Sequence, residues 1–249
     1  MKRLIPCVVA IAAFAAAGDA AAFEFGTKEQ RHPYRSSQHF ALELRFGPYK
    51  PAVDDEPGLR GTPFADSFDT NARLYAGLEF DWQTFRIPYV GTIGPGLSVG
   101  TVSMSRRAKT KTNPPQDSGD DYGLTIYPMY LSAVLRGDVF WREAGVPLVP
   151  YGKVGIGYGI WRATSTGSTS KFGGISGRGG TWGTHFALGL GFPLDALDRG
   201  ASRNMDNAVG INNTYFYAEY YWLTLNGIAQ SKALYVGTAS WVMGLAFEF

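Results

Sequence analysis

The amino-acid sequence predicts an all-β fold: an antiparallel, up-and-down, eight-stranded β-barrel that spans a membrane. Apolar residues alternate with small or polar residues in eight segments, as happens when the two faces of a strand meet different surroundings. Glycine is abundant at 32 residues, whereas charged residues make up only 18%. Beyond the amino terminus no segment is apolar enough for a membrane helix, so spanning requires a closed sheet.

The amino terminus has the features of a secretory signal peptide. Lys2 and Arg3 give it positive charge, residues 4–17 form an uncharged apolar run, and small residues follow up to Ala22. The run is shorter than the roughly 20 residues of a spanning helix. We expect cleavage before Phe23. The predicted parts are therefore the cleaved signal peptide 1–22, a periplasmic amino-terminal segment 23–37 and the barrel domain 38–249.

Cleavage would leave a mature chain without cysteine, because Cys7 is the only one. Disulfides, thiolate metal sites and cysteine nucleophiles are then excluded. The mature chain would carry 21 basic and 20 acidic residues, with no basic stripe of the kind that nucleic-acid binding requires. We therefore expect no nucleic-acid partner.

The strands are predicted in chain order from their alternation. The eight segments are residues 38–48, 73–83, 94–104, 124–140, 151–161, 182–192, 214–224 and 234–249. Their apolar faces run, in the same order, from Phe40 to Phe46, Leu74 to Trp82, Leu97 to Thr101, Tyr127 to Leu135, Val154 to Ile160, Trp182 to Phe192, Phe216 to Trp222 and Trp241 to Phe249. Pro128 weakens the fourth segment, because proline cannot donate to a sheet ladder.

The connections follow from an even strand number with both ends in the periplasm. The predicted outer loops are residues 50–72, 105–121, 162–181 and 225–233, and the predicted inner turns are residues 84–93, 141–150 and 193–213. The last turn is long for its side. Its segment Leu194–Arg199 could form a short helical turn.

Alternation alone does not decide which face meets lipid, since a lipocalin-like barrel or a β-sandwich turns the same apolar face inward. Here the polar face is dominated by Gly, Ala, Ser and Tyr, which suits the narrow interior of an eight-stranded barrel. Aromatic residues also gather near predicted strand ends, as in the girdles of membrane barrels. They are Trp82, Trp161, Trp182, Trp222, Tyr235 and Phe249. We therefore favour the membrane barrel.

This orientation directs the ionic residues of the strands into the lumen. They are Glu43, Arg45, Arg73, Glu79, Asp81, Arg136, Asp138, Lys153, His185 and Glu219. Buried charges are costly unless they pair, and the set holds both signs in near balance. We expect an interior salt-bridge network that plugs the lumen rather than an ion pathway.

The strand pattern, the signal segment and the terminal Phe249 resemble those of small outer-membrane β-barrels such as the OmpA transmembrane domain, OmpW and opacity-type proteins. The similarity covers residues 38–249 and implies the outer membrane of a Gram-negative bacterium, with outer-membrane lipid around the barrel. It also implies that Leu245, Phe247 and Phe249 are an assembly signal for the barrel-assembly machinery. It carries over no catalytic residue, metal or cofactor. We expect a structural or surface-interaction role without catalysis.

Two other functions stay open. An OmpW-like carrier or channel for small hydrophobic molecules would line an apolar cavity with tyrosines, namely Tyr127, Tyr130, Tyr215, Tyr217 and Tyr221. A lipid-modifying enzyme would need His185 beside a hydroxyl and an acid, for which Ser132, Asp138 or Glu219 are candidates. No spacing motif supports catalysis, so a hydrogen-bonding lumen histidine is the favoured interpretation.

The predicted outer loops contain one basic and two acidic runs. Arg106, Arg107, Lys109 and Lys111 could contact anionic lipopolysaccharide, although a solvated loop accounts for them equally well. The acidic runs 54–56 and 117–121 lack the ordered ligand spacing of a calcium loop. We expect them to be solvated loop tips.

Overall fold

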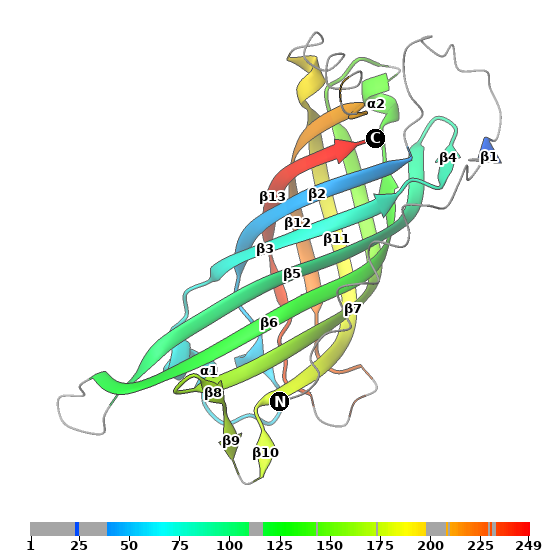
Figure 1. Ribbon diagram of the computed structural model, residues 1–249. Coiled ribbons are helices and arrows are strands. Elements are labelled where there is room, and N and C mark those ends of the chain that lie inside the picture. The colour runs from blue at the N-terminus through cyan, green and yellow to red at the C-terminus, as the bar shows by residue number, and fades with distance from the viewer. Residues whose placement is uncertain are drawn as a thin grey trace.

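The computed structural model is a closed antiparallel barrel of eight strands (Figure 1). It describes residues 23–24, 39–109, 117–142, 144–172, 174–197, 208, 210–228, 230 and 233–249. The barrel strands are β2 (Phe40–Tyr49), β3 (Arg73–Trp82), β5 (Gly91–Lys109), β6 (Asp117–Arg136), β7 (Val149–Ser165), β11 (Arg178–Pro193), β12 (Asn213–Thr224) and β13 (Thr238–Glu248). Each pairs with its neighbours along the chain, and β13 pairs with β2. The predicted fold class is confirmed.

Closure brings the two ends of the barrel sequence together. The strands β13 and β2 pair from Met243 opposite Phe46 to Glu248 opposite Ala41. The backbone of Phe249 exchanges hydrogen bonds with that of Phe40, at 2.9 and 3.0 Å. We call this end of the barrel the terminal end and the opposite one, which carries α1 and β8–β10, the loop end (Figure 1).

Short elements decorate both ends. The loop end holds η1 (Val53–Asp55), α1 (Pro63–Phe68), β8 (Ser168–Thr169), β9 (Lys171–Phe172) and β10 (Ile175–Ser176). The terminal end holds β4 (Phe85–Ile87), α2 (Val139–Arg142) and η2 (Leu194–Ala196), and β1 (Phe23–Glu24) pairs with β4 in parallel. The η2 turn lies where the sequence predicted a helical turn. No helix among the described residues is long and apolar enough to cross a membrane.

The amino-terminal predictions fall almost wholly outside the described residues. The predicted signal peptide, residues 1–22, lies outside them, and so does the predicted periplasmic segment apart from Phe23 and Glu24. Residues 198–207 of the long inner turn also lie outside. These boundaries therefore remain predictions.

Several strands are longer than predicted at the loop end. Residues 105–109 and 117–121 continue β5 and β6, and residues 162–165 and 178–181 belong to β7 and β11. The predicted loops 105–121 and 162–181 are therefore wrong at both margins. The error has a physical cause, because the outward residues of these extensions are polar and so give the segments the composition of a loop.

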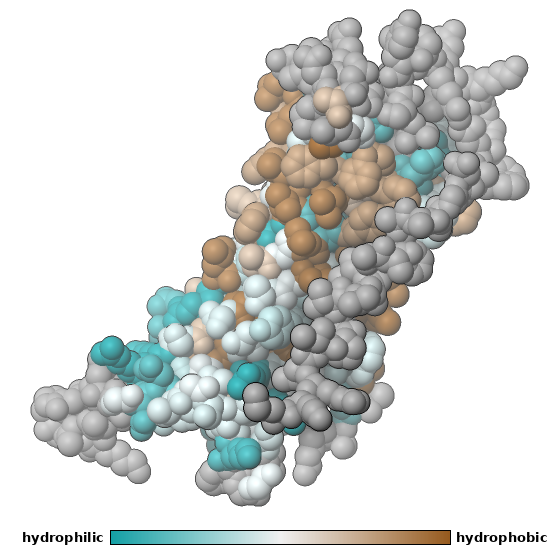
Figure 2. Space-filling view, in the orientation of Figure 1, coloured by the Kyte–Doolittle hydropathy of each residue, from teal (hydrophilic) through white to brown (hydrophobic). Residues whose placement is uncertain are grey.

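The outward face changes polarity along the strands. On β5, outward Leu97 and Val99 are exposed, at 50% and 41% of their surface, whereas outward Ser103 follows further along the same face. The inward face changes in the opposite sense, from buried Ser98 to buried Met104. Figure 2 shows apolar side chains over the wall near the terminal end and hydrophilic ones over the wall near the loop end. We call these parts the membrane segment and the loop-end segment.

The loop-end segment has the interior of a water-soluble protein. Strand residues such as Ile126 and Leu223 pack there with residues that the connections fold inward, among them Val53, Phe64 and Leu225. The connections are also tied to the wall by hydrogen bonds. The hydroxyl of Tyr49, for example, donates to the carbonyl oxygen of Val236 at 2.5 Å. The lumen is thus filled by apolar side chains at this level.

The membrane segment has the reverse arrangement, with large apolar side chains outside and charges inside. Leu131, Ile156 and Leu188 each expose about half of their surface, whereas Glu43 and Arg45 are fully buried. In water this arrangement would leave apolar surface solvated and charges desolvated, so the surrounding medium must be lipid. The molecule is a transmembrane β-barrel, and the orientation predicted from the sequence is confirmed.

Five of the six aromatic residues expected at strand ends fall into two groups, and the sixth, Tyr235, is partly buried in the connection before β13. Trp82, Trp182, Trp222 and Phe249 are outward and more than a third exposed, as an aromatic girdle requires. Trp161 instead packs against the interior cluster, because it shares the inward face of β7. Its assignment to the girdle is therefore wrong.

Candidate functional site

The candidate site is a cluster of ionic side chains inside the membrane segment. The inward positions of five strands supply its seven members, which are Glu43 and Arg45 on β2, Glu79 and Asp81 on β3, Arg136 on β6, Lys153 on β7 and Glu219 on β12. All seven are at most 4% exposed. We call this set the lumen network.

Arg45 stands at the centre of the lumen network. Glu43 and Glu79 are register partners on adjacent strands, an arrangement of like charges that is unfavourable by itself. The Nη1 of Arg45 lies 2.7 Å from a carboxylate oxygen of each, and its Nη2 donates to Glu219. One guanidinium thus joins three carboxylates from three strands, using the fixed fork of donors that arginine offers.

Two further cations complete the connections. The Nζ of Lys153 lies 2.8 Å from Glu43 and from Glu79, and 3.2 Å from Glu219. The Nη2 of Arg136 lies 2.5 Å from Glu43 and from Asp81. Each carboxylate is therefore held by at least one cation, and Glu43 is held by three.

Tyrosine rings enclose the cations. Arg45 lies 5.7 Å from the ring centre of Tyr130 and 5.9 Å from that of Tyr217. Tyr151 is approached by Arg136 at 5.5 Å and by Lys153 at 5.2 Å. Distances below about 6 Å allow cation–π attraction, which offsets part of the cost of removing these cations from water.

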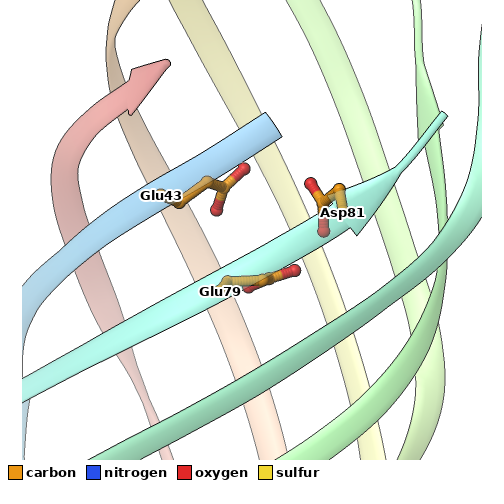
Figure 3. Close-up of side chains that lie close together, drawn as sticks. All are labelled: Glu43, Glu79 and Asp81. Carbon is orange, nitrogen blue, oxygen red and sulfur yellow. The ribbon is translucent and has the colours of Figure 1, made fainter. Parts of the chain in front are cut away.

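Three of the carboxylates lie close enough together to suggest a metal site. Figure 3 shows Glu43, Glu79 and Asp81 converging inside the barrel, and one oxygen of each lies within 4.8 Å of the others. All three already accept contacts from Arg45, Arg136 or Lys153, at 2.5 to 2.8 Å. Positive charge thus occupies the positions around them, so the residues fit a salt-bridge network better than a metal centre.

The network is not fully balanced, because its four carboxylates face three cations. The Oδ1 atom of Asp81 is buried and has no hydrogen-bond partner. Glu43, in contrast, accepts contacts on both of its oxygens. Asp81 is therefore the carboxylate whose charge the network holds least well.

His185 lies inside the barrel beside a hydroxyl group. Its Nδ1 is 2.8 Å from the Oγ of Ser132, and its ring stacks on Tyr130 with centroids 3.7 Å apart. In a catalytic triad the second ring nitrogen binds an acid, but here Nε2 is buried without a hydrogen-bond partner. His185 and Ser132 are only 1% and 3% exposed, so neither meets the surrounding lipid.

Two residues assigned to the lumen from the sequence lie away from the network. Arg73 is at the loop end, where its Nη2 lies 3.4 Å from Asp69. A backbone hydrogen bond from Asn71, assisted by Arg73, lowers the pKa of the Asp69 carboxyl. Asp138 is at the terminal end, 3.7 Å from Arg86. Both positions lie at strand ends, beyond the level at which the seven network residues meet.

A second polar cluster near the terminal end was not foreseen. Glu248 accepts hydrogen bonds from Gln83 at 2.8 Å, Asn213 at 3.0 Å and Tyr215 at 2.9 Å. The alternation along the last strand could have indicated this cluster, because Glu248 stands on the face opposite to Phe247 and Phe249. This cluster lies between the lumen network and the terminal end.

The tyrosines proposed to line a cavity do not form one. Tyr130, Tyr215, Tyr217 and Tyr221 are inward and at most 3% exposed, and they pack into the filled interior. Tyr127 is 48% exposed on the outer wall, so its assignment to the lumen is wrong.

The outer wall of the membrane segment carries a shallow apolar groove. It holds about 490 Å³ and is lined by residues of β4 to β7, including Phe85, Pro95 and Leu131. Beneath it the ladders are continuous, with Pro95 opposite Ala133 and Ser132 opposite Gly155. The groove therefore faces lipid and does not open into the lumen.

The basic run at the loop end does not form a uniform patch. Arg106 and Arg107 point to opposite faces of β5, and Arg107 stands opposite Asp121 of β6. Lys109 pairs in register with Asp117, and Lys111 lies outside the described residues. An acidic residue thus accompanies Arg107, the outward member of the pair.

No protein-family model and no curated protein matches this chain. Among solved structures it is similar to Ail, the attachment invasion locus protein of Yersinia pestis, in complex with the heparin analogue sucrose octasulfate. The identity is 15% and the TM-score is 0.40, and the match covers 85% of this chain and 97% of that one. The outer membrane protein OprG of Pseudomonas aeruginosa gives 12% identity and a TM-score of 0.45, over 86% and 97%. The amino-terminal β-barrel domain of OprF from the same organism gives 13% and 0.41, over 86% and 100%.

Likenesses of this size carry no inference about function. The assignment of the chain rests instead on its own strand pairing, its apolar exterior and its charged interior. A closed antiparallel barrel with an even number of strands, an outward apolar band and a polar interior is the architecture of bacterial outer-membrane proteins. The protein is an outer-membrane β-barrel of eight strands.

Proposed function

We propose that the protein is a sealed, non-catalytic barrel that anchors a rigid β-structure at the cell surface, where it serves envelope integrity or surface interaction. The observation that carries the proposal is the change of polarity along β5 and β6. The strands continue beyond the apolar band, with outward Ser103 and Ser105 and inward Val102 and Met104. Folded β-structure of this kind is stable in water.

The filled lumen supports a sealed barrel. Three layers follow one another along it: the Glu248 cluster, the lumen network and the apolar interior of the loop-end segment. An OmpW-like carrier would need a lumen cavity, whereas the inward Tyr130, Tyr215, Tyr217 and Tyr221 are at most 3% exposed and pack into the interior. A channel would need a continuous hydrated path, whereas the ionic side chains here are buried and paired with one another across several strands.

The geometry around His185 supports the absence of catalysis. The pair with Ser132 lacks the acid of a triad, and both side chains are buried away from lipid. A lipid-modifying enzyme would have to expose its nucleophile to acyl chains.

The orientation can be tested with single cysteines, since the natural Cys7 lies in the predicted signal peptide. We place the loop end outside the cell. Ser105 is exposed near the loop end and Ala144 near the terminal end, so the variants Ser105→Cys and Ala144→Cys place one thiol at each end. In intact cells a membrane-impermeant maleimide should label Ser105→Cys, and should label Ala144→Cys only after the outer membrane is permeabilised. The reverse pattern would refute the proposal.

Sealing can be tested on the purified protein in planar lipid bilayers. We expect no steady conductance from the folded barrel. Steady ion conductance in proportion to the amount of inserted protein would contradict a sealed lumen.

A further inference from the structure

Two arginines on the outer wall face each other, and neither has a counter-ion among the residues that the structure describes. Arg162 on β7 and Arg178 on β11 are register partners, exposed on the outward face. Partners of this kind have Cβ atoms about 5 Å apart, and like charges at that distance are unfavourable. The Nε of Arg162 donates to the Oγ1 of Thr169 at 2.9 Å, which orients the guanidinium. Neither arginine has an ion-pair partner in the part of the chain that the structure describes.

Two other arginines at the loop end, one inward and one outward, have acidic neighbours. Arg73 pairs with Asp69, and Arg107 stands opposite Asp121. Residues 149–193, in contrast, contain no Asp or Glu at all. The connection between β7 and β11 adds a third exposed cation, Lys171. The exposed charges of these two strands and their connection, Arg162, Lys171 and Arg178, are therefore all positive, and the nearest acidic contact is that of Asp120 on β6 with Thr166 of the connection at 3.0 Å.

The arginine pair lies at the edge of the apolar band. Four residues closer to the membrane on each strand, Tyr158 and Trp182 form an outward aromatic pair with ring centroids 4.6 Å apart. Aromatic residues of this kind mark the membrane interface, where lipid headgroups begin. Arg162 and Arg178 thus stand at headgroup level, beside phosphates rather than acyl chains.

We propose that Arg162 and Arg178, with Lys171 nearby, bind the phosphate groups of an anionic lipid in the outer leaflet. Paired guanidinium groups suit a phosphate, because its several oxygens accept bonds from both forks at once. The bound phosphate would also relieve the repulsion between the two arginines. The inference rests on the proposed orientation, which places the loop end outside the cell.

The test uses the full mature protein, folded in detergent, with purified lipopolysaccharide and its enzymatically dephosphorylated form as probes. The double variant Arg162→Gln/Arg178→Gln should bind lipopolysaccharide about 30-fold more weakly than the natural protein, since each basic residue near an anionic lipid contributes about a factor of five. The dephosphorylated lipid should bind the natural protein as weakly as lipopolysaccharide binds the variant. Arg107→Gln is the matched control and should change binding little. Unchanged heat-modifiable migration of each variant would show that it folds.

Equal affinity of the double variant and the natural protein would overturn the proposal, and so would an equal loss in Arg107→Gln. Competition by millimolar inorganic phosphate as effective as that by the lipid would also overturn it, because the site would then recognise free phosphate. Failure here is distinguishable from failure of the proposed function. The cysteine-labelling pattern depends on orientation alone and would be unaffected.

Discussion

Replacing Arg45 by methionine is the sharpest perturbation of the lumen network. Methionine replaces the aliphatic stem of the arginine side chain but not its guanidinium group, so the change removes the charge and the donors at the centre of the network. Arg45 contacts Glu43 and Glu79 at 2.7 Å, and also Glu219. At an effective dielectric constant of about 20, a contact of that length corresponds to an attraction of about 6 kcal/mol before the cost of desolvation is subtracted.

The net loss is smaller, because other cations remain. Lys153 still reaches all three carboxylates, and Arg136 still reaches Glu43. Removing one partner from a buried ion pair typically costs 3–5 kcal/mol. Since no carboxylate is left without a cation, we expect Arg45→Met to lower the free energy of unfolding by about 3 kcal/mol, the lower end of this range.

Urea unfolding of the barrel in phospholipid vesicles, followed by tryptophan fluorescence, would measure the effect. Arg73→Met is the control, because its pair with Asp69 is partly exposed and its loss should cost below about 1 kcal/mol. The double variant Arg45→Met/Glu219→Gln should recover part of the loss by removing one of the released carboxylates. If Arg45→Met were no less stable than Arg73→Met, the stabilising role of the network would be refuted.

Three further predictions concern the other layers of the barrel. Leu225→Ala should lower the free energy of unfolding by about 2–5 kcal/mol, because it opens a cavity in the loop-end interior, and an unchanged urea midpoint would contradict this. Leu131→Arg should cost about 2–4 kcal/mol in lipid vesicles, whereas Ser103→Arg should cost little, since only the first faces hydrocarbon; equal costs would contradict the membrane segment. Asp81→Asn should destabilise the barrel less than Glu43→Gln in the same assay, because Asp81 is held by one cation and Glu43 by three, and the opposite order would rule out this explanation.

The strands and their faces could be predicted from the sequence, because a strand repeats every two residues and each face here meets a constant medium over several residues. The inward glycines were expected for the same reason. The side chain of Tyr75 lies over Gly77 and Gly100, where a Cβ atom would come within 2.3 Å of it. The narrow lumen thus accommodates this ring because glycines on β3 and on the neighbouring β5 leave room for it.

The strand ends could not be predicted in the same way. Beyond Thr101 the outward residues of β5 become polar and the inward residues become apolar. The alternation therefore continues, but the apolar face is now the inward one. The composition of this segment therefore indicated a loop, although its backbone remains paired with the neighbouring strand. Trp161 was misplaced by a related error, because nearness to a predicted strand end was given more weight than its parity.

The contacts within the lumen network could not be predicted from the sequence either. Parity identifies Glu43 and Arg136 as inward residues but not as partners, since they are 93 residues apart and meet through the tilt and stagger of the closed barrel. The same limit applies to Arg162 and Arg178, which become neighbours only through the register of β7 and β11.

The central claim is that one continuous strand passes from lipid into water. It is tested most directly by spin labels at outward positions of β5, at Leu97, Val99, Ser103 and Ser105, in the protein reconstituted into lipid vesicles. We predict that the first two labels are accessible to oxygen and shielded from a water-soluble relaxation agent, and that the last two show the reverse. Equal accessibility of all four labels to the water-soluble agent would contradict the membrane segment and the account built on it.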